Sequence, residues 1–253
     1  MQHMEQIIDK EQQRKEYAFI HKLTKKFRKA LNKYELIEND DHILIGLSGG
    51  KDSLALVEFL GKQMQIFVPR FRVTAVHISV RNIGYQTDTA YLENYCRQFN
   101  VPFVHHVTEF DETIEPEKNI CFPCSWFRRK ALFRVAQELD CNKIALGHHQ
   151  DDIVETLLMN LFYQGSFGTM PPKLKMDKFE MTMIRPFCYL SEAELVQFAE
   201  MRNYKKQIRN CPYERNSQRS EMKQLLNQLK AINPNINKSV WNAMENIKTK
   251  YLP

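Results

Sequence analysis

The stretch "HILIGLSGGKDS", residues 42–53, joins a short apolar run to a turn that contains two glycines and a lysine. A short apolar run bounded by glycines is typical of a strand buried in a parallel sheet. The next residues, "LALVEFLGKQM" at 54–64, predict a helix. A strand, a glycine turn and a helix in this order place the turn where open α/β sheets bind their ligands. The stretch therefore predicts an α/β fold and an anion site at residues 48–53.

The alternation of strand and helix continues along the chain. Further strands are expected at 71–78, 101–107, 143–147 and 181–187, and helices at 89–99, 126–139 and 152–163. This order predicts a doubly wound, five-stranded parallel sheet with helices on both faces. Residues 165–178 are expected to form one long loop, and loops of that size are usually functional or mobile.

Helices are expected on both sides of this region. Residues 11–37 carry an apolar stripe of helical spacing with a lysine-rich surface around it. That surface fits a docked helix with a solvated face, or a helix that faces nucleic acid. A capping box at Ser191 and Glu194 opens the first of three C-terminal helices. We expect an N-terminal helical segment at 1–40, an α/β domain at 41–187 and a C-terminal helical region at 188–253.

Composition narrows the class of protein. The chain has 253 residues, 43% of them apolar, and a net charge of +6. Residues 171–253 contain 15 Lys and Arg against 8 Asp and Glu, an excess of +7, which fits a polyanionic partner or a solvated surface about equally well. No apolar run approaches the roughly 18–20 residues of a membrane span, and the N-terminus lacks the apolar core of a secretory signal. We expect a cytoplasmic protein that does not bind membranes.

The turn at 48–53 has the chemistry of a phosphate cradle. Its glycines permit sharp turns, its serines offer hydroxyls, and the following helix points free N–H groups at the same place. It is not a Walker A loop, because only three residues separate Gly46 from Gly50 and Asp52 follows the lysine.

Cys121 and Cys124 form the one C-x-x-C pair of the chain. This spacing suits a zinc site, an iron–sulfur cluster or a redox pair. A structural zinc site needs four ligands, and a thioredoxin-like pair directly follows a strand, whereas this pair follows an acidic loop. Cys96 and Cys141 lie in or beside apolar helical segments and are expected to be core thiols.

Two segments carry a resemblance to a known superfamily. "SGGKDS" resembles the PP-loop of the ATP pyrophosphatases, and "ALGHHQDDIVET" at 145–156 is similar to their Gly-His-x-x-Asp-Asp segment. The resemblance implies cleavage of ATP, with Mg²⁺, into AMP and pyrophosphate. It implies catalytic roles for Asp52 and Asp152 in handling Mg²⁺ and the triphosphate. The residues implied in nucleotide binding are Ser48, Gly49, Gly50, Lys51, Asp52, Ser53, His77, Ile78, Gly147 and His148.

Three more segments indicate one particular family within this superfamily. "CFPCSWFRRKALFRVAQEL", "GTMPPKL" and "CPYERNSQR", together with the two segments above, resemble the TtcA family of tRNA 2-thiocytidine synthetases over roughly residues 15–230. In that family three cysteines hold a 4Fe–4S cluster, and they match Cys121, Cys124 and Cys211. Bacterial relatives often carry a second C-x-x-C at the late site, where this chain has Ile208.

The TtcA resemblance implies a complete reaction. The enzyme would adenylate the 2-oxo group of a cytidine, expected at position 32 of the anticodon loop, and deliver sulfur from the cluster. The implied partners are tRNA and a cysteine desulfurase as sulfur donor, and a homodimer is compatible with this reaction. One alternative is a related PP-loop thiolase that acts on uridine in tRNA. Another is a non-catalytic, redox-sensing iron–sulfur protein that binds nucleic acid.

Overall fold

A computed structural model gives the structure of the chain. It describes residues 2–66, 68–81, 87–109, 121–177, 179–207 and 218–251, without the side chains of 2–9, 121–125 and 218. Cys211 and the loop around it therefore lie outside the described residues.

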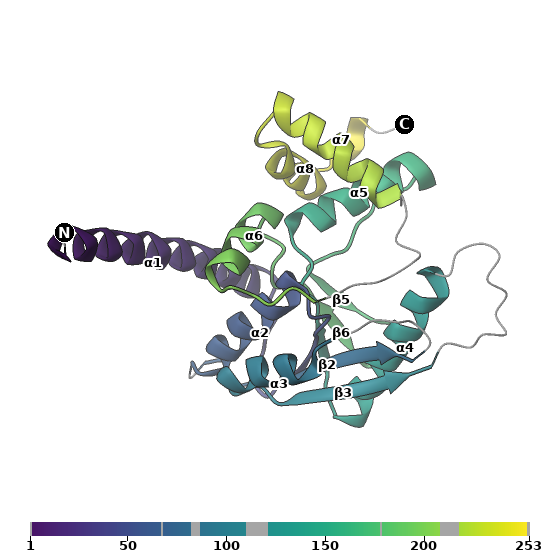
Figure 1. Ribbon diagram of the computed structural model, residues 1–253. Coiled ribbons are helices and arrows are strands. Elements are labelled where there is room, and N and C mark those ends of the chain that lie inside the picture. The colour runs from purple at the N-terminus through teal and green to yellow at the C-terminus, as the bar shows by residue number, and fades with distance from the viewer. Residues whose placement is uncertain are drawn as a thin grey trace.

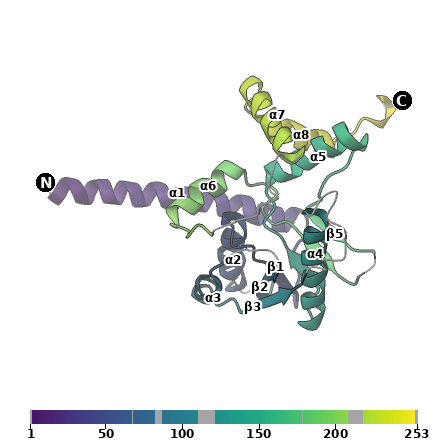
Figure 2. The same ribbon diagram turned by 45° about the vertical axis from the view of Figure 1, so that its right-hand side comes forward.

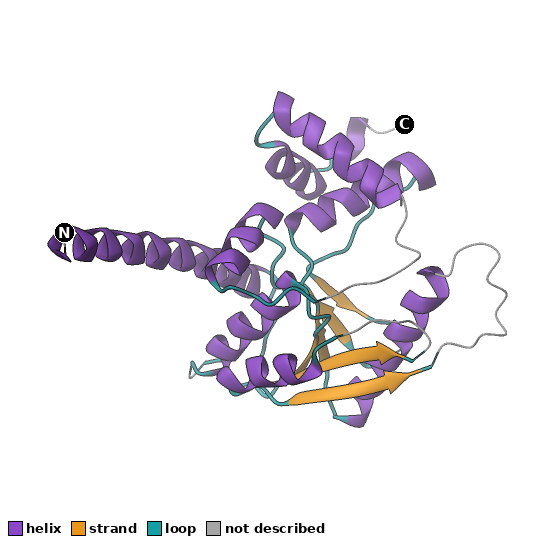
Figure 3. Cartoon of the chain, viewed as in Figure 1, coloured by secondary structure: helices purple, strands orange, loops and turns teal. Residues whose placement is uncertain are grey.

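One sheet occupies the centre of the described structure (Figure 3). Its strands in chain order are β1 His42–Gly46, β2 Arg72–Val80, β3 Phe103–Thr108, β4 Lys143–Ala145, β5 Lys173–Lys175 and β6 Thr182–Ile184. Their spatial order is β3-β2-β1-β4-β6-β5. All pairs are parallel except that of β5 with β6. The five predicted parallel strands and the α/β fold are confirmed.

The sixth strand was not predicted. Strand β5 lies inside the segment expected to be one long loop, and it pairs antiparallel with β6 at the edge of the sheet. A strand of three residues is too short to show an alternating pattern of apolar and polar residues. The expectation of five strands was therefore wrong by one edge strand.

Helices cover both faces of the sheet. Helices α2 Lys51–Met64 and α3 Thr89–Gln98 lie on one face, and α4 Cys121–Glu138 lies on the other (Figure 1). Alternate side chains of β1 divide between these faces, so that Ile45 belongs to the core with α2, and Leu44 packs with Leu132 and Val135 of α4. Two buried faces explain why the three central residues of this strand, 43–45, are all apolar.

Helix α1, Gln2–Lys33, extends away from the sheet at its N-terminal end (Figures 1 and 2). Its C-terminal half docks on the core through Leu23 and Phe27, which are buried. Part of its basic surface serves this docking, because Lys26 Nζ lies 2.7 Å from a carboxylate oxygen of Glu194. The helix starts earlier than the predicted 11–37 and ends four residues sooner, just before Glu35 takes a left-handed φ of 47°.

The C-terminal helices are α6 Glu192–Met201, α7 Gln218–Ile232 and α8 Ile236–Glu245, followed by a short 3-10 helix at Thr249–Tyr251. Helix α6 packs against α2 and α1, whereas α7 and α8 pack against α5, Gln150–Gln164. Val154 and Leu158 of α5 form a small core with Met222 and Leu226 of α7. Both views place α7 and α8 next to α5 (Figures 1 and 2). Among the described helices, none is long and apolar enough to span a bilayer.

Candidate nucleotide-binding site

The glycine turn lies at the carboxyl end of β1, as predicted. Gly49 has a φ of 78°, a left-handed conformation that glycine adopts without strain. Ser48 and Ser53 brace the turn, because their hydroxyl oxygens lie 3.1 Å apart and Ser53 Oγ donates to the Gly50 carbonyl at 2.9 Å. Gly50 is the N-cap of α2, so the free backbone N–H groups at the start of this helix face the glycine turn. The turn therefore presents backbone donors and hydroxyls to an anion.

Lys51 and Asp52 form the charged part of this turn. Lys51 Nζ lies 3.0 Å from Asp52 Oδ1, and it donates to Oδ2 at 3.1 Å. Oδ1 is buried and accepts no hydrogen bond of good geometry from a described residue. A buried carboxylate oxygen beside helix N–H groups and a lysine suits a bound divalent cation and its phosphates.

Gly147, after β4, packs against the glycine turn from the neighbouring strand. A Cβ on Gly147 would lie 3.0 Å from both the carbonyl carbon and the carbonyl oxygen of Asp52. A backbone contact of this kind cannot be relieved by rotating a side chain. Only glycine at 147 lets β4 approach the start of α2 this closely, which explains the glycine of the "GHHQDD" segment.

We expect Gly147→Ala to weaken nucleotide binding, because the added methyl group pushes the backbone at Asp52 away. The loss in affinity for α,β-methylene-ATP should be at least tenfold, or ~1.4 kcal/mol. Isothermal titration calorimetry measures it. Gly168→Ala is the matched control, because a methyl group there would have no other atom within 4 Å and its φ is not left-handed. Equal affinities for the two variants would contradict this role for Gly147.

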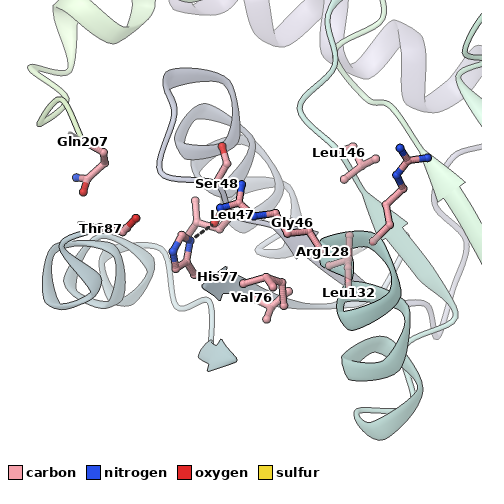
Figure 4. A pocket seen from close by; sticks show the side chains of 12 residues that line it. Gly46, Leu47, Ser48, Val76, His77, Thr87, Arg128, Leu132, Leu146 and Gln207 are labelled. Carbon is pink, nitrogen blue, oxygen red and sulfur yellow. Dashed lines mark hydrogen bonds between the residues drawn. The ribbon is translucent and has the colours of Figure 1, made fainter. Parts of the chain in front are cut away.

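His77 holds the backbone just before the turn. Its Nδ1 lies 2.8 Å from the carbonyl oxygen of Leu47. A carbonyl oxygen only accepts, so Nδ1 carries the proton and Nε2 is left as an acceptor. Burial lowers the pKa of His77, so the ring is neutral at neutral pH. The dashed line in Figure 4 marks this contact.

Two cavities flank the glycine turn. The first, of about 300 Å³, is lined by Ser48, His77 and Ile78, together with Thr87, Arg128 and Gln207. The second, of about 700 Å³, is lined by residues 49–52 of the glycine turn, by the last turns of α6, and by Lys205 and Lys206, which follow α6. Figure 4 shows the side chains of Ser48, His77 and Arg128 at the first cavity. The residues predicted for adenine and for phosphate are thus neighbours in space.

The Gly-His-x-x-Asp-Asp segment forms the start of α5. His149 is its N-cap, accepting at Nδ1 from the Asp152 backbone N–H, while Asp152 Oδ2 accepts from the His149 N–H at 3.0 Å. Burial lowers the pKa of His148 to about 4, so this ring is neutral. Its Nδ1 is buried and has no hydrogen-bond partner among the described residues. A neutral histidine with an unused ring nitrogen fits a polar ligand at this helix end.

Two arginines at this end were not predicted. Arg219 of α7 donates from Nη2 to Asp152 Oδ1 at 2.8 Å. Arg185, after β6, is buried, donates to the Pro171 carbonyl at 2.6 Å, and contributes to the low pKa of His148. Arg219 lies in the quoted "CPYERNSQR" segment, but its partner is 67 positions earlier, and no local spacing shows such a pair. For Arg185 the sequence holds no such clue.

The cysteines divide into two groups. Cys96, Cys141 and Cys188 are buried free thiols, as predicted for the first two. Cys121 and Cys124 lie in the first turn of α4, with side chains outside the described set, and Cys211 lies outside the described residues altogether. Among the described side chains, no three His, Cys, Asp or Glu residues gather as metal ligands.

Comparisons with known proteins show the family of this chain. Residues 19–228 match the family described as a PP-loop domain. A tRNA-cytidine(32) 2-sulfurtransferase of Nitrosospira multiformis is 37% identical over 94% of this chain and 83% of its own length. The protein of the same name from Syntrophotalea carbinolica is 37% identical over 91% of each chain. The chain belongs to the TtcA family of PP-loop proteins.

A solved structure also resembles this TtcA-family chain. The U34-tRNA thiolase NcsA from Methanococcus maripaludis, determined with its 4Fe–4S cluster, superimposes with a TM-score of 0.76 at 29% identity. The match covers 94% of this chain and 82% of that one. The likeness therefore extends beyond the nucleotide domain to the C-terminal helices.

Proposed function

We propose that this chain is an ATP-dependent tRNA sulfurtransferase that converts cytidine 32 of the anticodon loop to 2-thiocytidine. The observation that carries the proposal is the match to tRNA-cytidine(32) 2-sulfurtransferases over more than nine-tenths of the chain. The phosphate cradle at the end of β1 supports it, because this chemistry requires ATP. A cytoplasmic location, where tRNA is modified, belongs to the same proposal.

In the proposed reaction the chain first activates the base. The loop 48–53 and the N-terminus of α2 would bind the triphosphate, and the cavity at His77 and Ile78 would hold adenosine. Asp52 and Asp152 would bind Mg²⁺ on the phosphates, which offsets the charge that develops during transfer. The 2-oxo oxygen of cytidine then attacks the α-phosphorus, and the bond to the β-phosphate oxygen breaks. The products of this half-reaction are adenylated cytidine and pyrophosphate.

The second half-reaction replaces oxygen by sulfur. A sulfur nucleophile forms a bond to carbon 2 of the activated base, and AMP leaves with the former 2-oxo oxygen. A 4Fe–4S cluster held by Cys121, Cys124 and Cys211 would supply the place where sulfur is bound before transfer. A cysteine desulfurase would provide that sulfur as a persulfide, and a thiol reductant would supply the two electrons that release it at the sulfide level. Arg128 and Arg129, at the first cavity, would offset negative charge between the cluster and the phosphates. A homodimeric assembly, in which both copies keep this cavity open to tRNA, belongs to the same proposal.

A second candidate is thiolation of uridine, which the likeness to the U34-tRNA thiolase favours. The higher identity to the cytidine enzymes, 37% against 29%, favours cytidine. The two bases also differ chemically, because cytidine carries a 4-amino donor where uridine carries an oxo acceptor.

The test uses anaerobically reconstituted protein with unmodified tRNA, labelled ATP, Mg²⁺, cysteine, a cysteine desulfurase and dithiothreitol as the reductant. We expect AMP and pyrophosphate as products, in amounts that depend on tRNA. Mass spectrometry of the digested tRNA should detect 2-thiocytidine. Formation of ADP and phosphate would contradict the PP-loop chemistry, and 2-thiouridine in place of 2-thiocytidine would establish the second candidate.

A further inference from the structure

Both carboxylate oxygens of Asp152 have partners within the chain. Oδ2 accepts from the His149 backbone N–H at 3.0 Å, and Oδ1 accepts from Arg219 Nη2 at 2.8 Å. The guanidinium carries a fixed positive charge at any pH at which the protein folds. A divalent cation at Oδ1 would be repelled by that charge at close range. Arg219 and Mg²⁺ therefore compete for the same oxygen.

Arg219 has a second contact on which it can pivot. Its Nε donates to Glu155 Oε2 at 3.2 Å, and Glu155 is buried one turn along α5 from Asp152. The planar guanidinium bridges the two acids with two different nitrogen atoms. Rotation about the Nε contact would carry Nη2 away from Asp152 while the arginine stays attached to α5. The Arg219 side chain is 42% exposed, so space for this movement exists on the solvent side.

Helix α7 does not depend on the pair with Asp152 for its position. Lys230 Nζ lies 2.6 Å from Asp151 Oδ1, and Asn237 of α8 donates to the same oxygen at 2.8 Å. Met222 and Leu226 pack on α5 as well. Release of Asp152 can therefore be a side-chain movement at the first turn of α7.

We propose that Arg219 competes with Mg²⁺ for Asp152 and, once displaced, binds the triphosphate that arrives with the metal. The inference rests on the proposed function, which assigns Asp152 to Mg²⁺ and ATP. A triphosphate offers the guanidinium new acidic oxygens at the moment when the metal takes Asp152. Metal and nucleotide would then favour each other's binding through this one side chain.

The experiment compares Arg219→Gln with the wild type in two binding measurements. Mn²⁺ alone is titrated by electron paramagnetic resonance, and α,β-methylene-ATP with saturating Mg²⁺ by calorimetry. We expect Arg219→Gln to bind Mn²⁺ about fivefold tighter, because the competing charge is gone. We expect it to bind the nucleotide about tenfold more weakly, because a charged contact to phosphate is lost. Changes of opposite sign are not produced by simple loss of structure.

Two further variants complete the test. Lys223→Gln, one turn along α7, removes an ion pair with Glu192 at 2.6 Å and should change neither affinity. Arg219→Lys keeps the positive charge but lacks the planar guanidinium with its several N–H donors. Its Mn²⁺ affinity should be as weak as that of the wild type. The inference is overturned if Arg219→Gln weakens both ligands, or if it behaves as Lys223→Gln does. If the wild type itself binds no α,β-methylene-ATP, the proposed function fails, and this inference fails with it.

Discussion

Serine in place of any one of Cys121, Cys124 and Cys211 is expected to abolish tRNA thiolation. A 4Fe–4S cluster on three thiolates cannot lose one ligand and stay intact, and serine oxygen is a harder and poorer ligand for iron. We expect 2-thiocytidine to fall by roughly a hundredfold or more, together with the iron and sulfide bound per chain after anaerobic reconstitution. Binding of α,β-methylene-ATP should persist, because the glycine turn, His77 and α5 are contributed by other segments.

The buried thiols supply the matched controls. Cys96, Cys141 and Cys188 are buried, and burial raises their pKa to about 12, 11 and 12. They are therefore protonated at neutral pH and poor ligands for iron. Their serine variants should keep iron and thiolation while losing about 1–3 kcal/mol of folding free energy, because a hydroxyl is buried without a guaranteed partner. A full cluster in Cys211→Ser, or zinc in the wild type, would contradict the ligand assignment.

Asp52→Asn should remove adenylation while leaving the iron content unchanged. Asp52 lies in the first turn of α2, and its Oδ1 is buried beside Lys51. An amide of the same shape cannot neutralise Mg²⁺ and leaves Lys51 without its counter-charge. We expect AMP formation to fall by roughly 10²–10³, the usual scale for losing one electrostatic contact in the transition state. Single-turnover assays with labelled ATP and tRNA measure this rate.

Asp140→Asn is the control for this substitution. Asp140 is exposed, lies before the amino end of β4 and so away from the glycine turn at the carboxyl ends of the strands, and has a left-handed φ of 50°, which asparagine tolerates well. Its variant should form AMP at the wild-type rate. Comparable rates for Asp52→Asn and wild type would remove Asp52 from the catalytic residues.

Local patterns predicted most of the fold because the residues responsible are adjacent in sequence. The apolar run at β1, the two glycines after it and the start of α2 lie within about a dozen positions, so one stretch shows both the strand and its ligand-binding turn. The same holds for the capping box at Ser191, which the structure confirms. Strand β5 was missed because its three residues gain their conformation from β6, and a pattern so short has no period.

In the candidate site, local sequence patterns do not predict the contacts between residues that are distant in sequence. The sequence identified Gly147 as part of a motif, but only the structure shows that a side chain there would lie 3.0 Å from the Asp52 backbone. Likewise, the sequence predicted that Asp152 handles Mg²⁺ and the triphosphate, but only the structure shows that its Oδ1 pairs with Arg219. Packing of α7 on α5 decides this contact, and that packing uses apolar side chains, which do not specify a partner.

For this protein the sequence alone determined the α/β class, the phosphate cradle at residues 48–53 and the family resemblance, because each depends on residue types at short, regular spacings. The tertiary structure alone decided which distant groups meet there. It shows that His77 hydrogen-bonds the Leu47 carbonyl, that β5 pairs with β6 at the edge of the sheet, and that Arg219 pairs with Asp152. The physical reason is that backbone propensity and periodicity act over a few residues, whereas hydrogen bonds and ion pairs form between whichever groups the folded core brings together.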